Sequence, residues 1–189
     1  MSTPYRFSHA ARERALDALR LVAWADGVLR PEEVSAAHGA ALVLGVDPIP
    51  ARAWRQGEAS PGAQPWPSFA GLTPRERRIM FAGGAWLALV DGKQASQEVQ
   101  LLREMARRAD IDEKAVVELF DVARWVRTVH GGTGSWANEF GWLLQTANDV
   151  LGPGGAGATP PGPMPHRAAS VAPALAPVPR RAAPPGAAE

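Results

Sequence analysis

A pattern that occurs twice, at a fixed offset, constrains the fold of this chain more than any other feature of the sequence. An apolar stretch leads into Asp26-Gly27, and a second apolar stretch leads into Asp91-Gly92, 65 positions later. The register continues without a gap on both sides, through Ser8 and Thr73, Glu33-Val34 and Glu98-Val99, and residues 44–47 and 109–112. Self-similarity of this kind indicates that one supersecondary unit is built twice. We therefore expect a domain with two pseudo-symmetric repeats.

Each repeat predicts three helices. Ser8 and Thr73 are N-cap candidates, and each Asp-Gly pair provides a glycine that can end the first helix in the left-handed conformation. Pro31 suits the first turn of the second helix, where an alanine-rich face permits close approach of a neighbouring helix. We expect helices over residues 8–25, 31–44 and 48–56, then 73–91, 97–109 and 113–129, with a last helix at 136–151 capped by Ser135. The sequence thus predicts an all-α domain over residues 1–151, with repeats at about 8–56 and 73–128.

The last part of the chain has a different composition. Residues 152–189 hold ten prolines and no aromatic residue, and are otherwise mostly alanine and glycine. Such a segment buries too little apolar surface to offset the entropy lost on ordering. We expect residues 152–189 to form a disordered tail.

Composition excludes several classes of function. The net charge of +1 gives no general attraction to nucleic acid. The absence of cysteine excludes disulfides, thiolate metal sites and thiol enzymes. The N-terminus lacks the apolar core of a signal peptide, and no run approaches the roughly 18 apolar residues that a membrane span needs. We expect a soluble cytoplasmic protein with no transmembrane segment, while peripheral association with a membrane stays open.

The repeated carboxylates of the two turns are the candidate functional residues. Asp26 and Asp91 follow the C-terminal end of a predicted helix, where a negative charge is unfavourable. Either amides that open the next helix or a cation must offset that charge. Glu33 and Glu98 fall near the third position of the next helix, where a carboxylate can fold back on the N-terminus. We therefore expect Asp26 near Glu33 and Asp91 near Glu98, either as interlocking caps or as an oxygen-only cation site.

These turns resemble those of the TerB-like family, helical domains associated with tellurite resistance and chemical stress. Residues 24–33 read Trp-Ala-Asp-Gly-Val-Leu-Arg-Pro-Glu-Glu, and residues 89–98 read Leu-Val-Asp-Gly-Lys-Gln-Ala-Ser-Gln-Glu, with Gln97 in place of the first Glu. The resemblance covers about residues 8–128 and implies an all-helical domain without enzymatic activity. It also implies a divalent metal, calcium or magnesium, held by Asp26, Glu32, Glu33, Asp91 and Glu98.

Two functions stay open from the sequence. The first is a non-catalytic stress-response domain that binds a divalent cation through the acidic turns and docks on protein partners. The second is a purely structural helical adaptor whose turn carboxylates are only caps. Trp125, Trp136 and Trp142, near the glycine-rich segment 131–134, are candidate anchors for a protein partner. Neither function involves catalysis, so we expect no enzyme.

Overall fold

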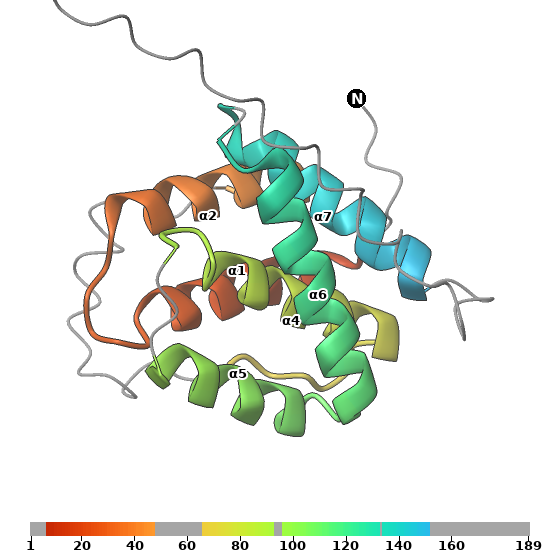
Figure 1. The fold of residues 1–189 in the computed structure, drawn as a ribbon. Coiled ribbons are helices and arrows are strands. Elements are labelled where there is room, and N and C mark those ends of the chain that lie inside the picture. Colours follow the sequence, from red (N-terminus) through yellow and green to blue (C-terminus); the bar gives the residue numbers. More distant parts are fainter. Residues whose placement is uncertain (1–6, 48–65, 93–95, 133, 152–189) are drawn as a thin grey trace, which may run out of the picture. The chain divides into compact units, whose positions relative to one another are not determined.

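The predicted helices that fall within the described part of the chain are all present. The computed structural model describes residues 7–47, 66–92, 96–132 and 134–151. Its helices are α1 (His9–Ala23), α2 (Pro31–Leu44), α4 (Pro74–Leu87), α5 (Ser96–Arg108), α6 (Glu113–His130) and α7 (Trp136–Leu151), labelled as in Figure 1. Every regular element in these ranges is a helix, which confirms the all-α prediction. The predicted helix at 48–56 and the predicted disordered tail at 152–189 lie outside the described residues.

The N-termini of α1 and α4 share one carboxylate. Ser8 caps α1, because its hydroxyl accepts the N–H of Ala11 at 3.1 Å. Thr73 caps α4 in the same way and accepts the N–H of Glu76 at 3.2 Å. The carboxylate of Glu76 in turn accepts the N–H of Thr73 at 2.9 Å and the N–H of Ser8 at 3.1 Å. Ser8 and Thr73 are equivalent positions of the two repeats, so the repeats meet at this end of the bundle.

The turns that follow α1 and α4 have the same geometry. The N–H of Gly27 donates to the carbonyl of Trp24 at 3.1 Å, and the N–H of Gly92 donates to the carbonyl of Leu89 at 3.3 Å. The φ angles of the two glycines are 79° and 72°, in the left-handed region that glycine adopts without strain. The left-handed glycines are confirmed in both repeats, but the helices end earlier than predicted, at Ala23 and Leu87, so each glycine shapes the turn after the helix and does not cap the helix itself.

The ends of α2 and α5 also correspond. The N–H of Val46 donates to the carbonyl five residues earlier at 3.1 Å, and that of Ile111 does the same at 3.0 Å. Gly45 and Asp110, which precede them, have φ angles of 64° and 55°. This local geometry recurs at the 65-residue offset of the sequence. Superposition of the two complete repeats stays a prediction, because part of the first lies outside the described residues.

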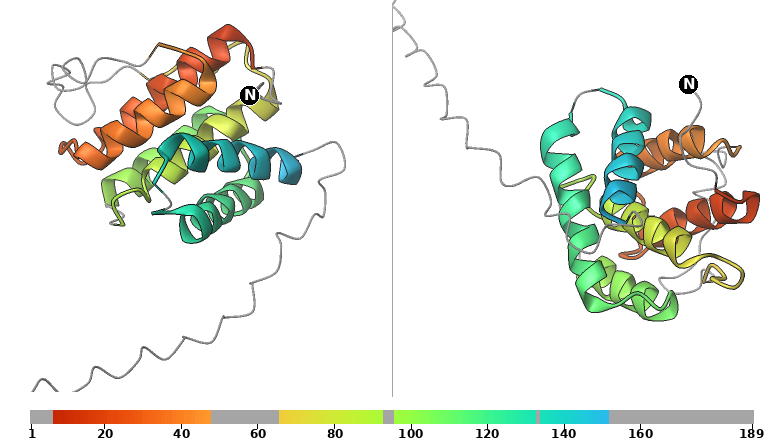
Figure 2. Two further views of the ribbon diagram at one scale, coloured as in Figure 1. Left: turned by 90° about the horizontal axis from the view of Figure 1, so that it is seen from above. Right: turned by 90° about the vertical axis from the view of Figure 1, so that its right-hand side faces the viewer.

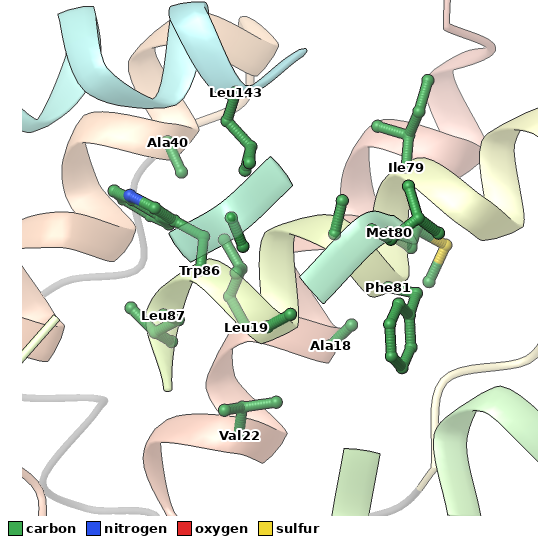
Figure 3. Packing of buried hydrophobic residues seen from close by; sticks show 14 of the residues in the cluster. Ala18, Leu19, Val22, Ala40, Ile79, Met80, Phe81, Trp86, Leu87 and Leu143 are labelled. Carbon is green, nitrogen blue, oxygen red and sulfur yellow. The ribbon is translucent and has the colours of Figure 1, made fainter. Parts of the chain in front are cut away.

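Helix α4 is the centre of the bundle and packs against each of the other described helices (Figure 1). Its side chains Phe81 and Trp86 are completely buried. Figure 3 shows part of this core, to which Leu19 of α1, Ala40 of α2 and Leu143 of α7 contribute. None of the described helices combines the length and apolar character that a membrane crossing requires.

Helix α2 crosses the start of α7 at Gly39. A Cβ atom at this position would lie 2.6 Å from Cβ of Trp136 and 2.7 Å from the backbone nitrogen of Ala137, distances that real Cβ atoms do not show. Ala36 and Ala40, which lie on the same side of α2 as Gly39, are buried as well, and so are Ala37 and Ala41 on the opposite side. A neighbouring helix does approach α2 closely, but the tightest point is a glycine on the side opposite Ala37 and Ala41.

Candidate functional site

Arg30 joins the two acidic turns. It lies in the loop between the first Asp-Gly turn and α2. Its Nη2 atom is 2.8 Å from Oδ2 of Asp26, and its Nε atom is 3.1 Å from Oδ2 of Asp91. Asp26 and Asp91 are equivalent residues, so one guanidinium holds together the turns of both repeats. Arg30 joins the turns that follow α1 and α4, and Glu76 joins the N-termini of the same two helices. The helices therefore run side by side in the same direction (Figure 2).

The first acidic turn contains the interlocking caps that its sequence predicts. Oδ1 of Asp26 accepts the N–H of Val28 at 2.8 Å. Oε2 of Glu33 folds back and accepts the N–H of Arg30 at 2.8 Å, which is the carboxylate half of a capping box at the start of α2. Nη1 of Arg30 also lies 3.8 Å from Oε1 of Glu33. Asp26 and Glu33 therefore lie together across the turn, as predicted, with Arg30 between them.

Two glutamates of this region are buried. Glu33 is 2% exposed and Glu98 is 1% exposed. Burial raises the pKa of Glu33 to about 7, although the hydrogen bond and the charge of Arg30 act in the opposite direction. The negative charges of Glu98 and Asp26 raise this pKa further, so Glu98 acts electrostatically on Glu33. We call Asp26, Arg30, Glu33, Asp91 and Glu98 the Arg30 cluster.

The predicted metal ligands do not all belong to one site. Glu32 is exposed on α2, outside the Arg30 cluster. The predicted proximity of Asp91 and Glu98 stays a prediction, whereas Asp91 is held by Arg30 of the other repeat. Within the described ranges, no three His, Asp or Glu side chains stand in positions to hold one metal ion.

Arg30 itself is the functional residue that the sequence analysis missed. Its spacing indicates the two local contacts, since Arg30 lies four residues after Asp26 and three before Glu33. Both carboxylates are within reach of its side chain at a turn or helix start. Nothing in the sequence pointed to its contact with Asp91. The hydrogen bond with Asp26 and the charges of Asp26, Asp91 and Glu33 raise the pKa of Arg30, although burial opposes them, so this guanidinium stays charged.

A second buried ion pair lies beside the second acidic turn. Glu139 of α7 is 2% exposed, and Nη1 of Arg127 lies 2.9 Å and 3.0 Å from its two carboxylate oxygens. The indole N–H of Trp86 donates to Oε1 of Glu139 at 2.7 Å. Nη2 of Arg127 donates to the carbonyl of Val90, the residue before Asp91, at 3.0 Å. We call Trp86, Val90, Arg127 and Glu139 the Arg127 cluster.

The Arg127 cluster was also missed by the sequence analysis. Glu139 lies in the first turn of α7, where the helix dipole stabilises a carboxylate even when it is exposed and has no other partner. Its burial depends on α4 and α6, which are distant in the sequence. The candidate anchors differ in exposure. Trp142 is 46% exposed and stacks on His130 with ring centroids 4.9 Å apart, whereas Trp125 and Trp136 are half-buried.

The resemblance to TerB-like domains rests on the motif residues around the two acidic turns. In the structure, four of the five carboxylates that the resemblance implies belong to the Arg30 cluster. Comparisons of the chain with protein-family models, with curated proteins and with solved structures find no match.

Proposed function

We propose that this chain is a non-catalytic helical adaptor of the TerB-like type, which docks on protein partners and whose acidic turns are joined by Arg30 instead of a metal. Its association with a stress response is part of the proposal and rests on the resemblance alone. The observation that supports the adaptor function is the triple contact of Arg30 with Asp26, Asp91 and Glu33.

The contact matters because the carboxylates need a counter-charge. Like charges this close cannot all stay ionised without one. Arg30 supplies it, and the remaining oxygens are partly used as well, since Asp26 accepts the N–H of Val28 and Glu33 accepts the N–H of Arg30. A carboxylate whose oxygens already bind a guanidinium and backbone amides is a poor additional ligand. The acidic turns thus serve the fold, and the adaptor acts through its surface.

A divalent cation is the second candidate, because the charges of the Arg30 cluster do not balance. Three carboxylates, Asp26, Glu33 and Asp91, contact one guanidinium, and the charge of Glu98 acts on Glu33 as well. Calcium or magnesium would be the suitable ions, since every side-chain donor is an oxygen. As the turns stand, however, the residues do not fit a metal, because an ion that bridges Asp26 and Asp91 would have to displace Arg30.

Thermal unfolding with and without millimolar calcium, magnesium or manganese tests the proposal. A cation that binds only the folded chain raises the melting temperature. We expect no rise. A rise that disappears in the double variant Asp26→Asn with Asp91→Asn would overturn the proposal in favour of the metal site. Glu32→Gln is the matched control, because Glu32 is exposed and lies outside the cluster.

The double variant also separates the two functions without added metal. If Arg30 joins the turns, the substitutions remove two charged partners of one guanidinium and lower stability, by about 1.5–3 kcal/mol for the charged hydrogen bond to Asp26 alone. If the carboxylates await a metal, the same substitutions relieve repulsion and stabilise the metal-free chain. The sign of the change in melting temperature therefore distinguishes the adaptor from the cation binder.

A further inference from the structure

We propose that the groove between α5 and α6 binds an amphipathic helix of a partner protein that carries carboxylates along the edge facing α5. The inference names a site and a partner chemistry for the docking that the proposed function assumes, and it rests on that function. The groove has a volume of about 690 Å³ and opens at the surface of the molecule.

The groove exists because α5 and α6 do not pack closely on each other. Both helices pack on α4, and α6 rises from one end of α5 after the turn at 109–112 (Figure 2). The surface between them is apolar, with Val99 and Ala106 from α5, Ile111 from the turn, and Val116, Val117 and Phe120 from α6. Val117 is 55% exposed. A contiguous apolar surface rimmed by charges is typical of a docking site.

The shape of the groove suits a helix. The residues of α6 that line it recur at helical spacing, from Glu113 through Val117 and Phe120 to Arg124. These twelve residues of α-helix extend about 18 Å, or three turns. A partner helix of similar length places apolar residues at i, i+3 or i+4, and i+7 into such a groove. A peptide that binds by adding a strand would need a free strand edge, and the described part of the chain has no strand.

The charges on the two walls differ and determine the orientation of the partner. The α5 wall contributes Arg103 and Arg107, of which Arg107 is paired with Glu104 at 2.7 Å, whereas the α6 wall contributes Glu113 and Asp121 along with Arg124. Asp121 is paired with Arg124 at 3.1 Å. Arg103 is exposed and has no ion pair with any described residue. Carboxylates on one edge of a partner helix would complement the α5 wall, and opposite charges of this kind set orientation and partner choice.

The basic wall belongs to the second repeat only. At the equivalent positions, 65 residues earlier, α2 has His38 in place of Arg103 and Leu42 in place of Arg107. Leu42 is 69% exposed, so this position of α2 presents an apolar side chain where α5 presents an arginine. This difference provides a control surface within the same molecule.

Selection from a displayed library of helical peptides tests the inference on the full chain. The library fixes leucine at i, i+4 and i+7 and randomises the two flanking positions of each turn. We expect selected peptides to carry Asp or Glu on one edge, and to shift the methyl NMR signals of Val99, Val116 and Val117. Peptides with Lys or Arg on both edges, or shifts confined to other valines, would overturn it.

Substitutions in the groove supply the second measurement. Val117→Asp should abolish binding of the selected peptide, and Arg103→Glu with Arg107→Glu should weaken it at least about tenfold, or by 1.4 kcal/mol. Leu42→Asp should leave it unchanged. All four substituted side chains are exposed, so each variant should keep the wild-type melting temperature. Equal loss in Leu42→Asp, or no loss in Val117→Asp, would contradict the groove as the site.

A second copy of the chain is the other occupant that the experiment detects. In sedimentation at increasing concentration, we expect the wild-type chain to stay monomeric. If the wild type self-associates and Val117→Asp abolishes that association, the groove is a self-association surface and the inference fails. The cation melts of the Arg30 cluster test the adaptor function independently, because those residues line no part of the groove.

Discussion

The two repeats have the same turns, but different surfaces of their second helices are covered. Helix α2 lies against α7, and Gly39 is the residue that allows the contact. Its equivalent in α5 is Glu104, which is 2.7 Å from both Arg107 and Arg108 at the surface. The first repeat thus has a glycine where α7 makes its close contact, and the second repeat has a charged side chain at the equivalent position. Among the described residues, the α5–α6 groove opens at the surface of the second repeat.

The repeats also differ in the arginine that holds each turn. Arg30 belongs to the first repeat, and its equivalent in the sequence is Ala95. The second turn is held from outside its own repeat, at Asp91 by Arg30 and at the carbonyl of Val90 by Arg127. Arg127 is balanced by one carboxylate, whereas Arg30 is shared by three. The contact of Arg127 with Glu139 is a fixed structural contact. The sharing of Arg30 leaves a carboxyl group, that of Glu33, whose pKa is about 7.

The largest effect is expected from Arg127→Met, which breaks the balanced pair. The substitution leaves Glu139 buried without its cation and the carbonyl of Val90 without its donor. Loss of one partner of a buried ion pair costs about 3–5 kcal/mol. Chemical denaturation measures the change in the free energy of unfolding. Arg124→Met is the matched control, because the Arg124–Asp121 pair is exposed and is worth at most about 1 kcal/mol. A similar small loss in Arg127→Met would show that the pair does not hold the turn.

A smaller effect is expected from Gly39→Ala, which adds a methyl group where α2 and α7 touch. Overpacking of this kind costs about 1–3 kcal/mol, and the atoms in the way include backbone, which cannot swing aside. The better helix propensity of alanine returns only about 1 kcal/mol. At the equivalent position, Glu104→Ala should change the free energy of unfolding far less, since it removes only exposed ion pairs. Equal changes at the two positions would contradict the asymmetry of the repeats.

The fold was predictable where it depends on neighbours in the sequence. Ser8, Thr73 and Asp112 each cap a helix through a side-chain oxygen that accepts an N–H three residues later. The capping box of Glu33 is equally local, and the sequence analysis identified it. Positions within a few residues of each other are fixed by the geometry of the helix end, so residue type and spacing suffice.

The partners that cross between repeats were not predictable. Arg30 contacts Asp91 only because α1 and α4 run in the same direction. The 65-residue offset of the repeats does not determine the relative direction of these helices. Glu139 meets Arg127 and Trp86 only because α6 and α7 both pack on α4. One sequence shows which positions are equivalent, but the packing of helices decides which of them touch.

The smallest change at neutral pH is expected from Glu33→Gln, which sharpens the comparison between the balanced and the unbalanced arginine. Glutamine keeps an oxygen that can accept the N–H of Arg30 and removes the buried charge. In the wild-type chain the pKa of Glu33 rises from 4.5 to about 7, so between these pH values the folded chain holds a proton that the unfolded chain has lost. Stability from this group is therefore complete below about pH 4.5 and is lost as pH rises toward 7, by at most about 3 kcal/mol.

The measurement is the difference in unfolding free energy between wild type and Glu33→Gln across that window of pH. We expect the wild type to lose stability relative to the variant as pH rises, because only the wild type must ionise a carboxyl group that is 2% exposed. Glu32→Gln removes an exposed carboxyl group one residue earlier and should leave the slope unchanged. A wild type that instead gains stability relative to Glu33→Gln over the same range would mean that Arg30 stabilises the ionised form more than burial opposes it. The Arg30 cluster would then behave as the balanced Arg127 cluster does, and the distinction between the two arginines would be lost.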